Sequence, residues 1–580
     1  MNRQEKDILL TILDHTFVSQ RILAELSGHS LGIVNKSLRS LSEHGYLDKY
    51  NRLTTKAIAE IRRNSPKSAI ILAAGFGMRM VPINTETPKA LLKVHGEVLI
   101  ERLIRQLHEA GINNINVVVG FMKEKFEYLI DEYNIRLIIN MEYASKNNLH
   151  SLFKASDHIL NTYIIPCDIW CRTNPFHASE LYSWYMVSDV LDPTSSVRII
   201  RNLELKPVSA AQTGNKMVGI AYLARMESQT VRNILAEMDM EPQYNNSFWE
   251  EAVFKNGTVI LQAKIITESQ FKEINTYEQL REFDEQSDHL KSEAILTIES
   301  AFNTTLDKIN DIQVLKKGMT NRSFLFSCNE RKYIMRIPGE GTEQLINRQH
   351  EASVYKALSG LEISDDVIYI NSDNGYKITS YWNESRVCDC NRTEDIILCM
   401  KKLKFFHQLK LNVAHTFNIF DTIDFYESLW PSHISVYKDY DKVKANVFSL
   451  WEYINENSSP YCLTHIDAVP DNFLILPGNE VRIIDWEYAG MQDPHVDIAM
   501  FCIYSLYEKE QIDQLIDIYF EDSCPFNIRL KIYCYISVCG LLWSNWCEYK
   551  RNLGIEFGEY SLRQYRYAKE YYDIVRKHIG

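Results

Sequence analysis

The sequence predicts a multidomain α/β and α+β protein with three segments that differ in charge and in hydrophobic pattern. Its 580 residues exceed what a single hydrophobic core organises. Residues 1–66 hold ten Lys and Arg against seven Asp and Glu, whereas the whole chain carries a net charge of −13. From residue 67 strand and helix patterns alternate, and after a polar linker near residues 284–296 strands give way to helices. The predicted domains are residues 1–66, 67–290 and 297–580.

Composition and the start of the sequence predict a cytoplasmic globular protein. It is 46% hydrophobic and 24% charged, and no run approaches the roughly 18 apolar residues that insertion into a membrane requires. The start, "MNRQEKDILL", lacks the apolar core of a signal peptide. The twelve cysteines form no paired CxxC sets, which argues against a zinc site or a disulfide framework. Net acidity argues against nucleic acid as the main partner.

The first segment has three helical patterns followed by a short alternating stretch. "VSQRILAELSG" begins with Ser19 as an expected cap and ends at Gly28, and "SLGIVNKSLRSLSEHG" follows it. "YLDKYNRLTT" alternates as a two-stranded hairpin does. This order resembles a winged helix-turn-helix with residues 30–44 as the recognition helix. That helix has only Lys36 and Arg39 for phosphate contacts, so DNA binding is disfavoured, while packing against neighbours and homo-oligomer formation stay open.

The second segment alternates buried strands with amphipathic helices. "AIILAAG", "INVVVG", "IRLIIN" and "YIIPCDIW" have strand patterns, and "EVLIERLIRQLHEAG" and "KEKFEYLIDEY" have helix patterns. Such alternation predicts a doubly wound, Rossmann-like parallel sheet with helices on both faces. Its ligand is expected beyond the carboxyl ends of the strands.

A glycine-rich loop, "LAAGFGMRMVPINTETPKALLKV", follows the first of these strands. It is neither a P-loop, because no GK[ST] ends it, nor a dinucleotide fingerprint, because the third glycine is absent. Gly75 and Gly77 allow backbone N–H groups to approach a phosphate closely. Arg79 and Lys89 supply the positive charge that a triphosphate needs.

The strand, the AAGxGxR loop and the PK pair ten residues beyond Arg79 resemble nucleotidyltransferases that join an NTP to a phosphorylated small molecule. "INVVVGFMKEKFEYL", "IINMEYASKNNLHSL" and "YIIPCDIW" resemble most of all the CTP:phosphocholine cytidylyltransferases of bacterial surface-polysaccharide pathways. The resemblance implies transition-state stabilisation by Arg79 and Lys89, and magnesium binding by Asp168. It further implies nucleotide contacts from Leu72, Ala74, Gly75 and Gly77, and a substrate pocket lined by Asn140, Glu142 and Asn147.

One position departs from that family. Where its members have a second metal carboxylate in an E-I-D sequence, "KEINTYEQLREF" has Asn275. An amide oxygen ligates magnesium more weakly than a carboxylate does. Either Asn275 serves as the ligand, or Glu250 or Glu251 of "FWEEA" assists, or the domain is impaired.

The third segment contains a second phosphate-transfer motif in "YCLTHIDAVPDNFLIL" and "VRIIDWEYAGMQDPHVDIAMF". Asp467, Asn472 and Asp485 have the catalytic-loop and metal-ligand spacing of protein-kinase-like phosphotransferases. In that chemistry a carboxylate, here Asp467, accepts the proton of the attacking hydroxyl. Asn472 and Asp485 supply oxygen ligands for the magnesium ions that bridge to ATP.

Stretches upstream of this motif indicate which family of protein-kinase-like phosphotransferases the segment resembles. "LKKGMTNRSFLFS" resembles the loop that covers the ATP phosphates, which assigns nucleotide binding to Gly318 and Asn321. "YIMRIPG" places Arg336 where protein kinases have a lysine, with Glu351 as its ion-pair partner. Arginine there, together with "GMTNRSF" and "IIDWEYAG", resembles choline and ethanolamine kinases and adds Glu487 to the substrate-binding residues.

Two tryptophans lie three residues apart in "LLWSNWCEYK". On aromatic spacing alone they indicate either core packing or a cage for a cation. The choline-kinase resemblance assigns Trp543 and Trp546 to the trimethylammonium group of the substrate, and "QYRYAKEYY" adds Tyr567 as a third wall.

The two resemblances imply consecutive reactions in one chain. Choline and ATP give phosphocholine, and phosphocholine and CTP then give CDP-choline and pyrophosphate, each step with Mg²⁺. The implied role is the decoration of bacterial surface polysaccharide or teichoic acid. Two alternatives stay open: an ethanolamine or amino-sugar kinase joined to a matching nucleotidyltransferase, and a DNA-binding regulator that senses choline or nucleotides.

Overall fold

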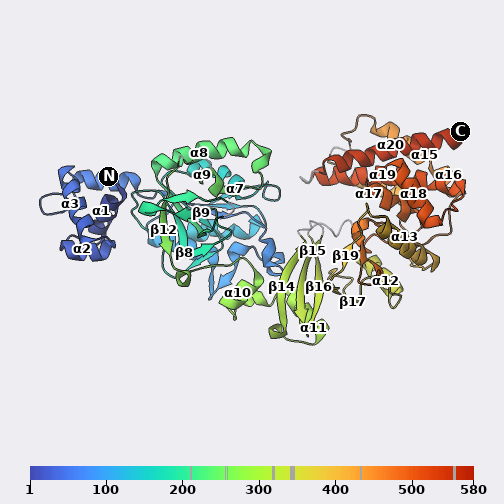
Figure 1. Cartoon of the computed structure of the whole chain (residues 1–580), viewed down its shortest axis with the longest axis horizontal. Coiled ribbons are helices and arrows are strands. Elements are labelled where there is room, and N and C mark those ends of the chain that lie inside the picture. The colour runs from blue at the N-terminus through green and yellow to red at the C-terminus, as the bar shows by residue number, and fades with distance from the viewer. Residues whose placement is uncertain are drawn as a thin grey trace. The chain divides into compact units, whose positions relative to one another are not determined.

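The computed structural model describes residues 1–209, 212–254, 257, 259–316, 321–339, 346–431, 434–552 and 557–579. The chain divides into two compact units, residues 1–292 and 293–580, and the division falls inside the polar linker. Figure 1 shows the helices and strands of both units. Within the described residues, none of the helices combines the length and the apolar composition needed to cross a membrane.

The first unit starts with four helices, where the sequence predicts three helices and a two-stranded hairpin. They are α1 (Arg3–His15), α2 (Gln20–Ser27), α3 (Leu31–Glu43) and α4 (Thr55–Asn64). Ser19, Ser30 and Thr54 begin the last three by accepting a hydrogen bond from the backbone N–H three residues later. The hairpin is reduced to one bridge, Leu47 with Leu53, because Thr54 caps α4 directly after it.

This helical segment packs against the sheet domain that follows it. Its buried apolar side chains, among them Ile8, Val34 and Leu38, form one core with Leu181. The Tyr182 hydroxyl donates a 2.7 Å hydrogen bond to Asp7 of α1. Residues 1–66 therefore belong to the same compact unit as the domain that carries the glycine-rich loop.

A seven-stranded sheet forms the centre of the first unit. Its strands are β1 (Ser68–Ala73), β4 (Ile115–Val119), β5 (Arg136–Ile139), β6 (Thr162–Pro166), β8 (Trp184–Asp192), β11 (Gly214–Leu223) and β12 (Gln262–Ile266), in the order β12-β8-β11-β6-β1-β4-β5. The predicted parallel arrangement holds for β5, β4, β1 and β6. Beyond β6 it does not, since β11 runs antiparallel to both β6 and β8.

Helices cover both faces of this sheet, as the sequence predicts. They are α5 (Leu99–Glu109), α6 (Tyr128–Tyr133), α7 (Asn148–Lys154), α8 (Arg225–Asp239) and α9 (Trp249–Phe254), and α10 (Tyr277–Phe283) follows later in the chain. Ile71 of β1 packs in one core with Ile104 of α5, whereas its neighbour Ile70 packs in the other with Leu152 of α7 and Leu235 of α8. Adjacent strand residues point to opposite faces, so the all-apolar β1 joins both cores.

The second unit opens with a helix and an antiparallel sheet. These are α11 (Glu293–Phe302), β14 (Ile309–Lys316), β15 (Asn321–Cys328), β16 (Arg331–Pro338), α12 (Arg348–Leu358), β17 (Val367–Ile370) and β18 (Lys377–Ser380). The strand order is β14-β15-β16-β18-β17, so the chain passes through α12 and β17 before β18 pairs with β16. The middle strand β16 carries Arg336.

The rest of the second unit is mainly helical, as predicted. Its helices are α13 (Thr393–Gln408), α14 (Ile419–Ser428), α15 (Tyr440–Ser449), α16 (Trp451–Glu456), α17 (His495–Tyr504), α18 (Lys509–Phe520), α19 (Phe526–Asn552) and α20 (Glu559–Ile579). The short strands β20 (Cys462–Thr464), β21 (Phe473–Ile475), β22 (Val481–Ile483) and β23 (Gly490–Gln492) lie between α16 and α17 in the chain. They frame the loops that carry Asp467 and Asp485. The long helix α19 is buried along most of its length.

Candidate active sites

The glycine-rich loop of the first unit leaves the sheet at the carboxyl end of β1. Gly77 has a φ of +58°, a left-handed conformation that favours glycine. A Cβ atom at this position would come within 3.3 Å of the Lys89 Cβ. The glycine therefore permits both the turn and the close approach of the lysine.

Three segments that are distant in the sequence converge beside this loop. Asp168 follows β6, and Asn275 follows the short strand β13 (Phe271–Glu273). The Lys89 ammonium forms an ion pair with the Asp168 carboxylate and donates a 2.6 Å hydrogen bond to the Asn275 amide oxygen. Arg79 donates to the same oxygen at 3.3 Å. The structure thus brings together the four residues that the sequence assigns to phosphate and metal binding.

Asn275 lies where the family's second carboxylate is expected, and its amide group is held on both sides. Its oxygen faces the two cations, while its Nδ2 donates a 2.5 Å hydrogen bond to Glu273. The Asp168 carboxylate and the Asn275 oxygen converge on the Lys89 ammonium, and oxygen donors are the ligands that magnesium prefers. Among the described residues no cluster of three or more His, Cys, Asp and Glu forms a complete metal cage. The donor set therefore fits a magnesium ion that Asp168 and Asn275 would hold, with its remaining ligands to be supplied by nucleotide phosphates and water.

An open cavity of about 1110 Å³ surrounds this cluster. Nine of the predicted residues line it: Leu72, Ala74, Gly75, Gly77, Arg79, Lys89, Asn147, Asp168 and Asn275. Further lining residues, which the sequence did not assign to substrate contact, are Tyr185, Tyr244, Phe248, Glu250 and Glu251. Aromatic and acidic side chains together suit an acceptor that carries a positive charge.

Glu250 is a lining carboxylate whose surroundings change its acidity. The Tyr185 hydroxyl donates a 3.0 Å hydrogen bond to one carboxylate oxygen. The other oxygen is buried and has no hydrogen-bond partner. Burial raises the pKa of Glu250 to about 7, so its charge responds to pH near neutrality.

Asn140 and Glu142, which the sequence assigns to the substrate pocket, are not among the residues that line the cavity. Asn140 is fully buried, donates to the Ser151 hydroxyl at 3.0 Å and accepts from the Glu142 backbone N–H at 2.9 Å. The Glu142 carboxylate lies 2.8 Å from His150. These contacts tie the loop after β5 to α7, whose N-cap is Asn147.

In the second unit a buried ion pair links β16 to α12. Arg336 donates two hydrogen bonds, of 2.6 and 2.7 Å, to the two carboxylate oxygens of Glu351. Arg348 lies 3.2 Å from the same carboxylate. Burial opposes ionisation, but the charges of Arg336 and Lys377 outweigh it and lower the pKa of Glu351 to about 2. The predicted arginine–glutamate pair is therefore present in a bidentate geometry.

Carboxylates gather around the free side of Arg336. Its guanidinium lies 3.8 Å from Asp485 and 3.7 Å from Glu487. Asn321, the first residue of β15, donates a 3.1 Å hydrogen bond to Glu487. Gly318, predicted to bind the nucleotide with Asn321, lies outside the described residues.

The catalytic loop places Asp467 beside this group. Asn472 donates to the Asp467 backbone oxygen at 2.9 Å and to its carboxylate at 3.0 Å. Burial, and then the charges of Asp485 and Glu487, raise the pKa of Asp467 well above its usual range. A carboxylate with a raised pKa is a stronger base, which suits the acceptance of a proton.

Asp497 of α17 holds the start of this loop, and sequence reasoning assigned it no role. It accepts hydrogen bonds from the backbone N–H groups of His465 (2.9 Å) and Ile466 (2.7 Å). Ile466 has a φ of +71°, which is costly for a β-branched residue. The buried carboxylate therefore stabilises a strained turn immediately before Asp467. The one sequence signal for Asp497 is its position in "DPHVDIAMF", shortly after Asp485.

The tryptophan pair of α19 lies next to the loop that carries Asp485 and Glu487, the acidic loop. Trp543 and Trp546 pack edge to face with ring centres 5.3 Å apart, and Tyr488, which follows Glu487, lies 6.2 Å from Trp543. Phe557 lies 5.1 Å from Trp546. Between residues 541 and 550 only Trp543, Trp546 and Tyr549 retain partial exposure, which gives α19 one accessible aromatic stripe.

Tyr567 does not share this accessible stripe. It is fully buried in the packing of α19 against α20, and its hydroxyl donates to the Tyr507 carbonyl at 2.7 Å. Close contact is possible because Gly540 faces it, and a Cβ atom there would lie 2.9 Å from the Tyr567 Cβ. The rings that the structure places beside the tryptophan pair are instead Tyr488 and Phe557.

Together the two sites define a nucleotidyltransferase joined in one chain to a protein-kinase-like phosphotransferase. Residues 69–182 match the family model of the MobA-like NTP transferase domain, and residues 312–519 match that of choline/ethanolamine kinase. These matches leave out residues 1–66, whose winged-helix resemblance stays a prediction.

Curated relatives narrow both assignments. Choline-phosphate cytidylyltransferase of Streptococcus pneumoniae is 30% identical over 241 residues, which make up 40% of this chain and 99% of that protein. Protein LicA of Haemophilus influenzae is 31% identical over 267 residues, 43% of this chain and 76% of that protein. A crystal structure of choline kinase LicA from Streptococcus pneumoniae, 27% identical, covers 49% of this chain and 100% of its own with a TM-score of 0.43. The chain therefore belongs both to the choline-phosphate cytidylyltransferase family and to the choline/ethanolamine kinase family, and the predicted fusion is confirmed.

Proposed function

We propose that the chain converts choline to CDP-choline in two steps, first by phosphorylation with ATP and then by transfer of CMP from CTP. The observation that carries this proposal is the accessible aromatic stripe of α19 beside the acidic loop of the kinase site. Faces of tryptophan attract quaternary ammonium groups, and an uncharged sugar would gain nothing comparable from them. The product would supply activated phosphocholine for the decoration of a bacterial surface glycan.

In the kinase step Asp467 orients the hydroxyl of choline and accepts its proton. The hydroxyl oxygen forms a bond to the γ-phosphorus of ATP, and the bond between that phosphorus and the β,γ-bridging oxygen breaks, which releases ADP. Arg336, fixed by Glu351, directs its charge to the nucleotide phosphates. Bound Mg²⁺, held by Asn472 and Asp485, would neutralise charge on the transferred phosphoryl group.

In the cytidylyltransferase step no nucleophile from the protein is required. A phosphate oxygen of phosphocholine attacks the α-phosphorus of CTP, and pyrophosphate leaves with the electron pair of the broken P–O bond. Arg79 and Lys89 stabilise the negative charge on the transferred and leaving phosphates. Tyr185, Phe248, Glu250 and Glu251 form the cavity wall that would receive the trimethylammonium group.

Mass spectrometry of the purified full chain tests the proposal. With choline, ATP, CTP and Mg²⁺ we expect CDP-choline, with choline and ATP alone phosphocholine, and with phosphocholine and CTP alone CDP-choline. Ethanolamine and glucosamine in place of choline test the alternative substrates. Turnover of ethanolamine in preference to choline would replace the proposed substrate, and no product with any of the three would contradict the enzymatic proposal.

A further inference from the structure

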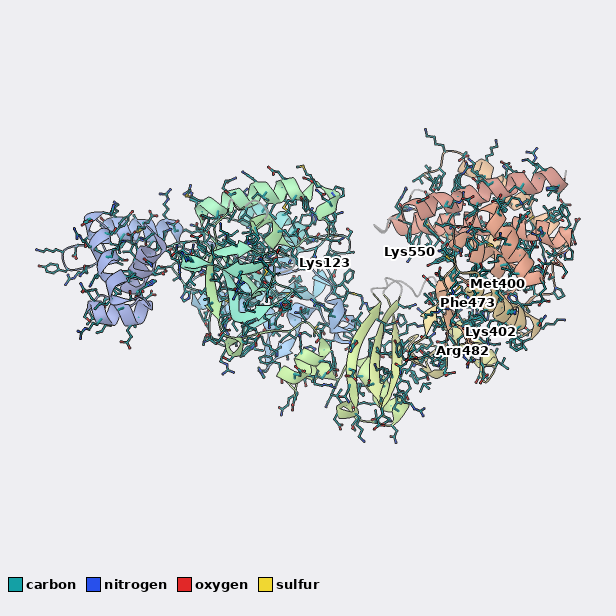
Figure 2. All side chains as sticks on the ribbon, viewed as in Figure 1. Lys123, Met400, Lys402, Phe473, Arg482 and Lys550 are labelled. Atoms are coloured by element: carbon teal, nitrogen blue, oxygen red, sulfur yellow. The ribbon has the colours of Figure 1, made fainter. Side chains whose placement is uncertain are left out.

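A lysine extends the aromatic stripe of α19. Trp543, Trp546 and Lys550 are spaced i, i+3 and i+7, so they lie along one face of the helix. Figure 2 marks Lys550 near the end of α19. Its side chain is only 8% exposed, which is unusual because lysine is among the residue types least often buried.

The Lys550 ammonium is held by aromatic rings. Its Nζ lies 5.6 Å from the centre of the Trp546 ring and 5.7 Å from that of the Tyr549 ring. Both distances fall within the range of a cation–π interaction. Trp546 is one of the two rings that the proposed function assigns to the ammonium group of choline. The structure therefore places a cation of the protein on the surface that the substrate would use.

The charge of Lys550 is not neutralised by a salt bridge among the described residues. Lys569 on α20 provides the contrast, since its Nζ lies 5.7 Å from the Tyr565 ring and also pairs with Asp439. Burial lowers the pKa of Lys550, and the charge of Glu487 opposes that shift. Glu487 also contacts Arg336, so the acid whose charge acts on Lys550 belongs to the kinase site.

We propose that Lys550 is a resident cation of the choline pocket, which a quaternary ammonium must displace in order to bind. The inference rests on the proposed function, because it concerns the same aromatic surface. Two cations at one ring face repel each other in a partly desolvated site. The flexible four-carbon stem of lysine allows the ammonium to withdraw into water when the substrate enters. Lys550 thereby weakens choline binding, because the contact between its ammonium and Trp546 is lost when choline binds. The pocket favours ligands whose own contacts make up for that loss.

The test compares Lys550→Met with Lys569→Met in the full chain. Methionine keeps much of the apolar stem and removes the charge. We expect Lys550→Met to lower the KM for choline about tenfold, because choline no longer has to displace the ammonium from Trp546. The size of the effect is that of one cation–π contact. The KM for ATP should stay unchanged. Lys569→Met removes a lysine at a matched ring distance and should leave both constants at their wild-type values.

Binding of tetramethylammonium, followed by tryptophan fluorescence, gives a readout that requires no turnover. Tighter binding to Lys550→Met than to wild type supports the inference, even if choline is not phosphorylated, in which case only the proposed function fails. An unchanged or weaker affinity in a folded Lys550→Met variant overturns the inference, even if choline is turned over. Lys550→Gln replaces the methionine variant if the latter does not fold, with the same expected direction.

Discussion

The two phosphate-transfer sites of this chain have opposite arrangements of charged side chains. In the first unit two cations, Arg79 and Lys89, surround one carboxylate and one amide. In the second unit Asp485 and Glu487 lie beside Arg336, Arg348 also approaches Glu487, and the charges of these two acids act on Asp467. The first site therefore carries much of the charge that a triphosphate needs, whereas the second depends on divalent cations to bring its carboxylates and ATP together.

The carboxylate cluster also changes the acids themselves. Burial and the neighbouring Asp485 raise the pKa of Glu487 to about 7, although Arg336 opposes that shift. Asp467 shifts in the same direction for the same two reasons. In the first unit Asp168 has a lysine in direct contact instead. The charges of the kinase site therefore favour acceptance of a proton, whereas those of the nucleotidyltransferase site favour neutralisation of phosphate charge.

The largest expected effect comes from Asp467→Asn, which should separate the two sites. Removal of the proton acceptor should lower choline phosphorylation by about a thousandfold. CMP transfer to supplied phosphocholine should persist, since Asp467 lies in the other compact unit. ADP release with choline and pyrophosphate release with phosphocholine and CTP measure the two activities separately.

Asp471→Asn is the matched control for that variant. Asp471 lies four residues further along the same loop, is exposed and accepts a hydrogen bond from Tyr504. It should keep most of the kinase activity. Loss of both activities in a folded Asp467→Asn protein would refute two independent sites.

Lys89→Ala should produce the converse phenotype. Loss of the ammonium that bridges Asp168 and Asn275 should lower CMP transfer by roughly a hundredfold to a thousandfold, the range for one preorganised electrostatic group. Phosphocholine should then accumulate from choline and ATP. The exposed Lys93, four residues away, provides the control Lys93→Ala. A CTP-dependent rate within a few-fold of wild type would show that Lys89 does not act on the triphosphate.

Trp543→Ala and Trp546→Ala should each raise the KM for choline about tenfold and leave the KM for ATP unchanged. Trp→Phe should cost less, because phenylalanine keeps an aromatic face. If the rings served only as core, either alanine variant would instead lower the free energy of unfolding by about 3–5 kcal/mol without selectivity for choline. A choline titration beside a thermal unfolding curve distinguishes these outcomes, with the exposed Trp451→Ala as the control.

The smallest expected effect concerns Glu250. Because its folded pKa of about 7 exceeds the ordinary value of 4.5, the folded state retains a proton that the unfolded chain releases. The carboxyl therefore destabilises the fold progressively as the pH rises from about 4.5 to about 7, and constantly above that. Glu250→Gln should raise the Tm at pH 8 by a few degrees and leave it unchanged at pH 4.5.

Glu237→Gln, at an exposed position of α8, controls for the loss of a negative charge from the same unit. Its Tm relative to wild type should be the same at both pH values. A difference for Glu250→Gln that does not depend on pH would contradict the raised pKa.

The features that could be predicted from the sequence are those that local chemistry sets. The order of strands and helices, the glycine loop and the spacing of Asp467, Asn472 and Asp485 all depend on residues that are close together in the chain. Hydrophobic period, caps and turn residues act over a few positions, so their patterns are visible in the sequence. The same holds for the tryptophan spacing on α19. These features were sufficient to predict both domain types and nine of the residues that line the first cavity.

Contacts between residues that are distant in the sequence could be seen only in the tertiary structure. The antiparallel β11 and the wall formed by Glu250 and Tyr185 depend on strand pairing across the sheet, which carries no local signal. Burial removed Asn140 from the cavity lining and placed Tyr567 behind α19, although both match sequence motifs. Lys550 was invisible for the same reason: its spacing marks the helix face, but only packing determines that a long, flexible cation remains against Trp546 instead of reaching water.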